Sequence, residues 1–260
     1  MITIRRVLAA SAVIAAAAVA GCGAHNPGSP GGSGGRSLVD ALTGRTGGPE
    51  CLLVYVDVTR SDSPGFHIGA WSDAERRVIS FMSQAAPGSA CEVWTTSAVP
   101  GRPMRQRVFR TGRALPRDRK RLSREVAAGM AQAEARSEKG ADALPYSPVM
   151  EDTYSLIERG SGLGVPYRLV DETDCLQYSP SLRATEILRA QSDPSALVGR
   201  TTKEFPPPDT SPADVSLVWY PGDAGGRPLT GVEEEALTGF FARMVREWGS
   251  NCTVSQPSDG

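Results

Sequence analysis

Three oxygen-bearing side chains follow one apolar segment at alternate positions. The segment CLLVYV ends at Val56, and Asp57, Thr59 and Ser61 come directly after it. If the loop after Val56 wraps around one point, this acid and these two hydroxyls converge on it. Hard cations such as Mg²⁺ favour oxygen donors and retain several waters. We therefore expect Asp57, Thr59 and Ser61 to bind Mg²⁺ or Mn²⁺, with enough uncompensated charge on the ion to accept a carboxylate from a partner.

The segments that must position these residues alternate between strand-like and helical patterns. Strands are expected over residues 51–56, 91–98, 105–110, 166–173 and 215–220. Helices are expected to begin near residues 72 and 147 and to span residues 117–138, 181–191 and 232–248. This alternation predicts an α/β domain with a mostly parallel central sheet and helices on both faces, a doubly wound fold. Such sheets bind ligands at the carboxyl ends of their strands, which is where Asp57 lies.

The D-x-[ST]-x-S spacing of Asp57, Thr59 and Ser61 resembles the metal-ion-dependent adhesion site of von Willebrand factor A-like domains. In that family a Ser or Thr in a later loop and an Asp after the fourth strand complete the site. Ser147 stands at the start of an expected helix, and Asp174 lies in TDCLQYSP, which is similar to the SD-x-L-Q turn of bacterial members. The resemblance covers about residues 50–250. It implies a von Willebrand factor A-like fold with a divalent cation on these five residues.

Two acids inside the fourth expected strand leave the last ligand open. Asp171 and Glu172 lie within PYRLVDET, and burying an unpaired carboxylate is costly. The strand could instead end at Val170, so that Asp171 faces the cation. The equal length of segments 51–57 and 165–171 favours this solution. We prefer Asp174 as the ligand, with Asp171 as the alternative.

The N-terminal segment indicates export and lipidation. Arg5 and Arg6 precede an apolar run over residues 7–20, which has the length of a signal peptide and is too short to span a membrane. The run closes in VAGC at Cys22, which resembles the lipobox of bacterial lipoproteins. In that family the cysteine is lipidated and becomes the first residue after cleavage. The resemblance implies a lipid anchor on Cys22 and an extracytoplasmic position at the cell membrane.

Composition divides the chain into four regions. We expect a signal peptide over residues 1–21, the lipidated cysteine and a Gly/Ser/Pro-rich tether over 22–37, a single domain over 38–252 and a polar tail over 253–260. Without the two signal-peptide arginines, 26 basic and 29 acidic residues leave a net charge of −3. This weak negative charge argues against a nucleic-acid partner, because such proteins usually carry a basic surface.

Four further cysteines could form disulfides in an exported chain. They are Cys51, Cys91, Cys175 and Cys252, and three connectivities are open to them. In a parallel sheet Cys175 would lie at the opposite end from the other three, beyond the Cα separation of about 7 Å that a disulfide allows. We therefore expect Cys175 to be unpaired. A clasp found in some von Willebrand factor A-like domains implies a bridge between Cys51 and Cys252.

The resemblance favours a binding protein that engages a protein or cell-envelope partner through its cation. One alternative is a structural or assembly lipoprotein without an active metal site. Another is a phosphatase-like hydrolase, but the haloacid-dehalogenase-like pattern D-x-D has Thr59 at its second acid. The chain after the tether contains no G-x-S-x-G elbow and no Walker or dinucleotide motif. His67, the only histidine after the tether, is expected in a loop, so we do not expect an enzyme.

Overall fold

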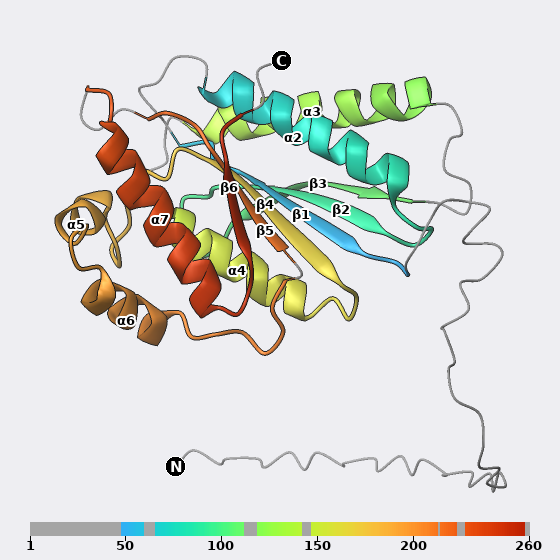
Figure 1. Ribbon diagram of the computed structural model, residues 1–260. Coiled ribbons are helices and arrows are strands. Elements are labelled where there is room, and N and C mark those ends of the chain that lie inside the picture. The colour runs from blue at the N-terminus through green and yellow to red at the C-terminus, as the bar shows by residue number, and fades with distance from the viewer. Residues whose placement is uncertain are drawn as a thin grey trace, which may run out of the picture.

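The computed structural model describes residues 48–59, 66–111, 119–141, 147–212, 214–222 and 227–257 (Figure 1). The expected signal peptide, Cys22 and the tether lie outside the described residues, and so does Ser61. None of the described helices combines the length and the apolar character needed to cross a membrane.

A six-stranded sheet forms the centre of the domain. Its order is β3-β2-β1-β4-β5-β6, and every neighbouring pair is parallel except β2 and β3. The strands are β1 (Cys51–Val56), β2 (Ala90–Thr95), β3 (Met104–Arg110), β4 (Tyr167–Thr173), β5 (Asp214–Trp219) and β6 (Cys252–Ser255). The predicted mostly parallel α/β sheet is therefore confirmed. The sequence did not predict β6, a four-residue edge strand of mixed polarity.

Helices cover both faces of this sheet, as predicted. They are α2 (Phe66–Gln84), α3 (Arg119–Ala141), α4 (Val149–Ser161), α5 (Ala184–Arg189), α6 (Ser195–Glu204) and α7 (Gly231–Glu247). Figure 1 shows α2 and α3 on one face and α4 and α7 on the other. Strand β1 contributes to the core on both sides, with Leu52 and Val54 towards α2 and Leu53 and Tyr55 towards α4. Burial on both faces explains why β1 is apolar at every position.

Two helical features differ from the prediction. Helix α2 begins at Phe66 and not at Ser72, because Ala70 and Trp71 are buried against the sheet and extend its apolar face towards the N-terminus. Helix α6 was not predicted. The predicted start of α7 is confirmed: the side chain of Thr230 accepts a hydrogen bond from the backbone N–H of Glu233.

The strand order places a topological switch point at the carboxyl end of β1. Strands β2 and β3 lie on one side of β1, and β4, β5 and β6 lie on the other. The chain leaves β1 for α2 on one face and leaves β4 for α5 on the other. Ligands of open α/β sheets bind at such a switch point. Asp57 and Asp174, which follow β1 and β4, both lie at this edge.

The cysteines do not form the predicted clasp. Cys51, Cys91, Cys175 and Cys252 are all free thiols. Cys51 is in β1 and Cys252 in β6, with β4 and β5 between them. Three strand spacings of about 4.8 Å separate these strands by roughly 14 Å, which is too far for a disulfide. The structure thus contradicts the Cys51–Cys252 bridge, and Cys175 has no disulfide partner among the described residues.

This arrangement predicts the result of thiol labelling without reductant. After unfolding in guanidinium chloride, iodoacetamide should modify Cys51, Cys91, Cys175 and Cys252, as peptide mass spectrometry would show. Cys51 and Cys252 should react to the same extent with and without prior reduction. Labelling of these two cysteines only after reduction would show that the strand order described above is wrong.

Candidate functional site

The site is centred on Asp57, whose side chain is completely buried after the end of β1. Its Oδ1 atom accepts hydrogen bonds from the Thr59 hydroxyl at 2.7 Å, the Thr59 backbone N–H at 2.9 Å and the Thr96 hydroxyl at 3.0 Å. Its Oδ2 atom accepts from the hydroxyls of Ser147 at 3.2 Å and Thr173 at 3.3 Å. Four hydroxyls from four segments of the chain therefore converge on one carboxylate.

Strand register explains why these segments meet. Val56 is aligned with Thr95 of β2 and with Glu172 of β4, so the next residues along each chain lie side by side. The backbone N–H of Asp57 continues this pairing with a 2.9 Å hydrogen bond to the carbonyl of Glu172. Thr96 and Thr173 are the residues that follow the aligned pair, so parallel pairing brings both hydroxyls to Asp57.

The structure brings together three of the five predicted ligands. Thr59 and Ser147 both donate to Asp57. Ser147 stands before Pro148 at the start of α4, but its side chain does not cap the helix. Its hydroxyl is directed to Asp57 instead. Ser61 lies outside the described residues.

Asp174 is buried at the same edge of the sheet, in the turn after β4. Its Oδ1 atom accepts from the backbone N–H of Leu176 at 2.9 Å, and Cys175 between them has a left-handed φ of 57°. The loop after β5 approaches closely at Gly222, where a Cβ would lie 3.2 Å from the Cβ of Asp174. Thr173, one residue earlier, supplies the hydroxyl that reaches Asp57.

The two acids of β4 lie within the strand, so the strand does not end at Val170. Asp171 accepts from the Thr153 hydroxyl of α4 at 2.9 Å, and its second oxygen has no partner among the described residues. Glu172 faces the opposite side, where Arg77 donates to it at 2.9 Å. The ion pair with Arg77 offsets part of the cost of burying Glu172, whereas Asp171 has a single hydrogen bond and no ion pair among the described residues.

A series of hydrogen bonds leads from Asp57 to α4, and the sequence did not predict it. The Tyr55 hydroxyl lies 2.8 Å from the Thr96 hydroxyl and donates to Asp152 of α4 at 3.1 Å. The backbone N–H of Gly101 donates to the other oxygen of Asp152 at 3.0 Å.

One feature of the sequence could have pointed to Thr96. It follows directly after β2, and neighbouring parallel strands end at the same edge of a sheet. The signal for Asp152 is absent from the sequence, since its partner Tyr55 is 97 residues away.

Buried acidic side chains are concentrated around the first turns of α4. Asp57, Glu151, Asp152 and Asp171 are all buried, and none of them forms an ion pair within the part of the chain that the structure describes. Burial raises the pKa of Asp152 to about 8 and that of Asp171 to about 7. This edge of the sheet therefore favours any process that adds positive charge, either a proton or a cation.

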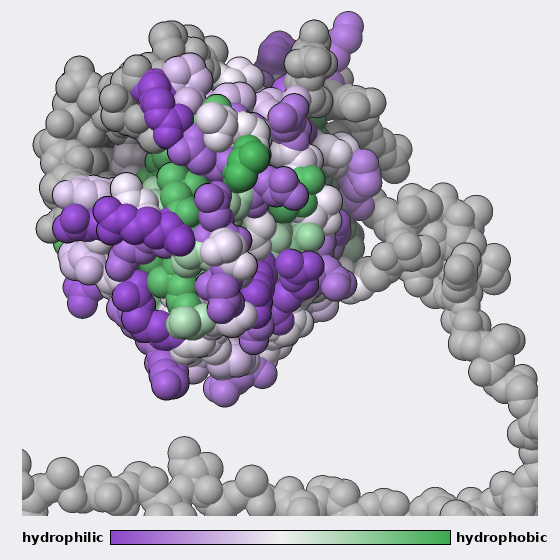
Figure 2. Space-filling model, turned by 60° about the vertical axis from the view of Figure 1, so that its left-hand side comes forward, coloured by the Kyte–Doolittle hydropathy of each residue, from purple (hydrophilic) through white to green (hydrophobic). Residues whose placement is uncertain are grey.

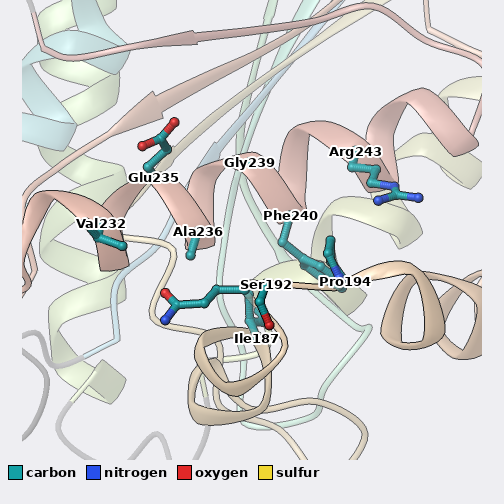
Figure 3. Close-up of a pocket in the computed structure, with 10 residues that line it drawn as sticks. Ile187, Ser192, Pro194, Val232, Glu235, Ala236, Gly239, Phe240 and Arg243 are labelled. Atoms are coloured by element: carbon teal, nitrogen blue, oxygen red, sulfur yellow. The ribbon is translucent and has the colours of Figure 1, made fainter.

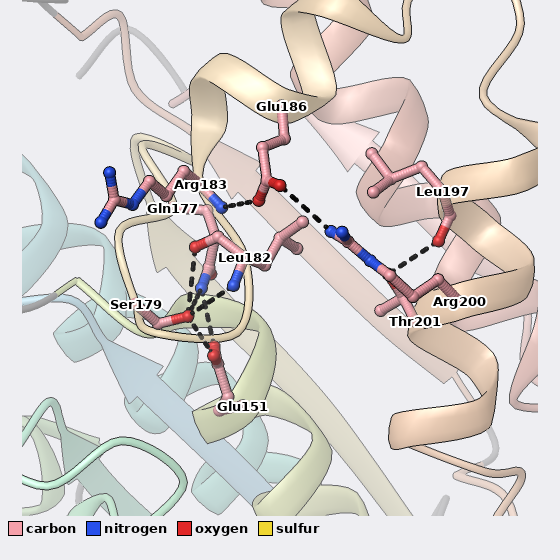
Figure 4. A network of polar contacts seen from close by, with 9 residues as sticks. All are labelled: Glu151, Gln177, Ser179, Leu182, Arg183, Glu186, Leu197, Arg200 and Thr201. Atoms are coloured by element: carbon pink, nitrogen blue, oxygen red, sulfur yellow. Dashed lines mark hydrogen bonds and ion pairs between the residues drawn. The ribbon is translucent and has the colours of Figure 1, made fainter.

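A hydrogen-bonded network ties the loop after β4 to the start of α4 (Figure 4). Gln177 accepts from the backbone N–H of Met150 at 2.8 Å and donates to Glu151 at 2.7 Å. The Ser179 hydroxyl also donates to Glu151. Ser147 and Tyr178 exchange two backbone hydrogen bonds, of 2.9 and 2.8 Å. The segments that carry Ser147 and Asp174 are thus held together by their neighbours.

The donor set at Asp57 fits a hard cation better than a soft one. One carboxylate and several hydroxyls are oxygen ligands of the kind that Mg²⁺ and Mn²⁺ prefer. No group of three or more His, Cys, Asp or Glu side chains within the described ranges is arranged to hold a metal ion, so zinc-type ligation finds no support there. Any cation at Asp57 would depend on hydroxyl oxygens and water for most of its ligands.

Comparison with known proteins adds no assignment: no protein-family model and no curated protein sequence matches this chain.

The buried carboxyl groups predict how stability changes with pH. Burial raises the pKa values of Asp152, Asp171 and Glu172 to about 8, 7 and 8. Between pH 4 and these values the folded state binds more protons than the unfolded state, so the free energy of unfolding falls as pH rises. Urea unfolding should show that the free energy of unfolding falls from pH 5 to pH 8. Asp171→Asn should reduce the slope of this fall by up to about 1.4 kcal/mol per pH unit. An unchanged slope in Asp171→Asn, or a change equal to that of the exposed control Asp209→Asn, would contradict this account.

The network at α4 predicts unequal effects for two glutamine substitutions. Gln177→Ala removes the acceptor of the Met150 N–H and a donor to Glu151 in a buried position, which should cost about 1–3 kcal/mol in urea unfolding. Gln191→Ala is the matched control, because Gln191 is exposed and makes no hydrogen bond within the described part of the chain. Its effect should stay within about 0.5 kcal/mol. Equal effects would show that the network does not stabilise the loop.

Proposed function

We propose that this chain is a membrane-anchored extracytoplasmic lipoprotein with a von Willebrand factor A-like domain. The domain binds a protein or envelope partner through a divalent cation, Mg²⁺ or Mn²⁺. The order of elements supports this reading, since Asp57 follows β1, Ser147 precedes α4 and Asp174 follows β4. These are the positions at which the family carries its adhesion site.

The convergence of four hydroxyls on buried Asp57 carries the proposal. Thr59, Thr96, Ser147 and Thr173 each place an oxygen within 3.3 Å of this carboxylate. A hydroxyl oxygen keeps lone pairs while it donates, so the same groups can serve as cation ligands or bind its waters. The cation would supply an electrophilic centre, and a carboxylate from the partner would complete its charge. The buried acids around α4 form no ion pair among the described residues, and a nearby cation would favour their ionised forms.

The anchor gives this site its place in the cell. We propose that Cys22 is lipidated and that the tether over residues 22–37 presents the domain at the outer side of the membrane. Several acyl chains on one residue give firm attachment without a transmembrane helix. The partner would then be a neighbour in the envelope or on the cell surface.

One observation favours a second function, that of a structural or assembly lipoprotein without an active cation site. The five hydrogen bonds to Asp57 satisfy both of its oxygens with donors of the chain itself. A buried aspartate with this set of donors can hold loops together with no ion present. The two functions share the fold and differ in whether a cation displaces these hydrogen bonds.

Calorimetric titration separates these two functions. Full-length protein, with Cys22→Ser to prevent acylation, should give saturable heat with MgCl₂ or MnCl₂. Asp57→Asn should weaken binding at least about tenfold, because it removes the charged ligand and keeps its size. The exposed control Asp209→Asn should bind like the wild type, and circular dichroism should show the same fold in all three proteins.

Absence of saturable heat in the wild type, or equal heat in Asp57→Asn, would reject the cation-dependent function and favour the structural one. If the cation binds, capture of partners from a cell-envelope extract should be lost in EDTA and restored by excess Mg²⁺.

A further inference from the structure

A groove lies between α7 and the turn that joins α5 to α6. It has a volume of about 320 Å³, at the lower end of the range for small-molecule sites. Figure 2, which brings the α5–α7 side of the molecule forward, shows hydrophobic surface between hydrophilic side chains on this face. The groove is separate from the Asp57 site and shares no lining residue with it.

The floor of the groove is apolar and belongs to the core. Ile187 of α5 and Phe240 of α7 line it and are each only 2% exposed, so packing beneath fixes their side chains. In the close-up, Phe240 points towards Pro194 and Ile187 (Figure 3). An apolar ligand could therefore lie against a surface that is already ordered.

A glycine in the middle of α7 keeps this floor open. Gly239 lines the groove, and a Cβ built on it would have no atom within 4 Å. Glycine inside a helix is destabilising relative to alanine, and alanine would fit here without a clash. Folding alone therefore favours alanine at this position, whereas close approach of a ligand to α7 favours glycine.

Arg243 provides a charge at one end of the groove. Arg243 is half-buried and makes no ion pair or hydrogen bond within the described ranges. Figure 3 shows Arg243 beyond Phe240 along α7, whereas Glu235 points away from the α5 side. The planar guanidinium matches a carboxylate through two parallel hydrogen bonds.

We propose that this groove binds a medium-chain aliphatic carboxylate, with the carboxylate on Arg243 and the chain across Phe240 and Gly239 against Ile187 and Pro194. The polar groups of the groove favour this ligand over a peptide. A peptide would bury several amide groups, and besides the charged side chains the groove offers only Gln191 and Ser192 as polar side chains among its described lining residues. An aliphatic acid needs a partner only for its single charged end.

Isothermal titration with sodium octanoate tests this proposal on full-length protein carrying Cys22→Ser, so that no acyl chain of its own competes. The wild type should bind octanoate in a saturable manner. Arg243→Gln should weaken binding about tenfold or more, and octanol should bind the wild type about tenfold more weakly than octanoate. An absence of saturable heat at millimolar octanoate, or equal binding by Arg243→Gln or of octanol, would overturn the proposal.

Two glycine variants provide a matched control for folding. Gly239→Ala and Gly199→Ala both add a methyl group to an exposed helical glycine with open space around it, so each should raise the Tm by about 2 °C. Only Gly239→Ala should weaken octanoate binding, because Gly199 lies outside the groove. Equal octanoate affinity in the two variants would overturn the placement of the aliphatic chain on α7.

The dipeptide N-acetyl-Ala-Leu, which also carries one carboxylate, tests the choice of ligand. If the wild type binds this dipeptide more tightly than octanoate, the choice of an aliphatic acid is overturned.

Discussion

The buried carboxylate of Asp57 constrains the whole carboxyl edge of the sheet. A charge removed from water is tolerated only when hydrogen bonds replace the lost hydration, and Asp57 receives five of them. Their donors come from the loop after β1, the end of β2, the end of β4 and the residue before Pro148. These segments must therefore meet for the domain to fold, and the register of β1 with β2 and β4 is what makes them meet.

The same constraint connects stability with the proposed binding of a cation. Glu151, Asp152 and Asp171 lie near the start of α4 without an ion pair in the described part of the chain, so ionising all three together would be costly. Protons held on Asp152 and Asp171 reduce that cost, as their raised pKa values indicate. A divalent cation at Asp57 would reduce it further. The site thus combines a structural role, which the hydrogen bonds satisfy, with an electrostatic environment suited to an ion.

The sequence predicted those features that depend on local pattern. The apolar run of β1, the helix expected over residues 232–248 and the alternation of strands and helices are all local, and each is confirmed. Asp57, Thr59 and Ser147 were found because their spacing and order resemble a known motif. Thr96 and Thr173 were missed because the sequence placed both inside expected strands, over residues 91–98 and 166–173, and their contact with Asp57 follows from strand register. The Cys51–Cys252 bridge failed for a related reason, since it required β1 and β6 to be close and two strands lie between them.

The central claim is that Asp57 and its hydroxyls form a divalent cation site. Anomalous diffraction from crystals grown in MnCl₂ tests it most directly, because manganese can be located without reference to function. The account predicts one strong anomalous peak within coordination distance of a carboxylate oxygen of Asp57, with hydroxyl oxygens of Thr59 or Ser147 or their bound waters among its ligands. A crystal with manganese in the solvent and no peak at Asp57, with the five hydrogen bonds intact, would contradict it.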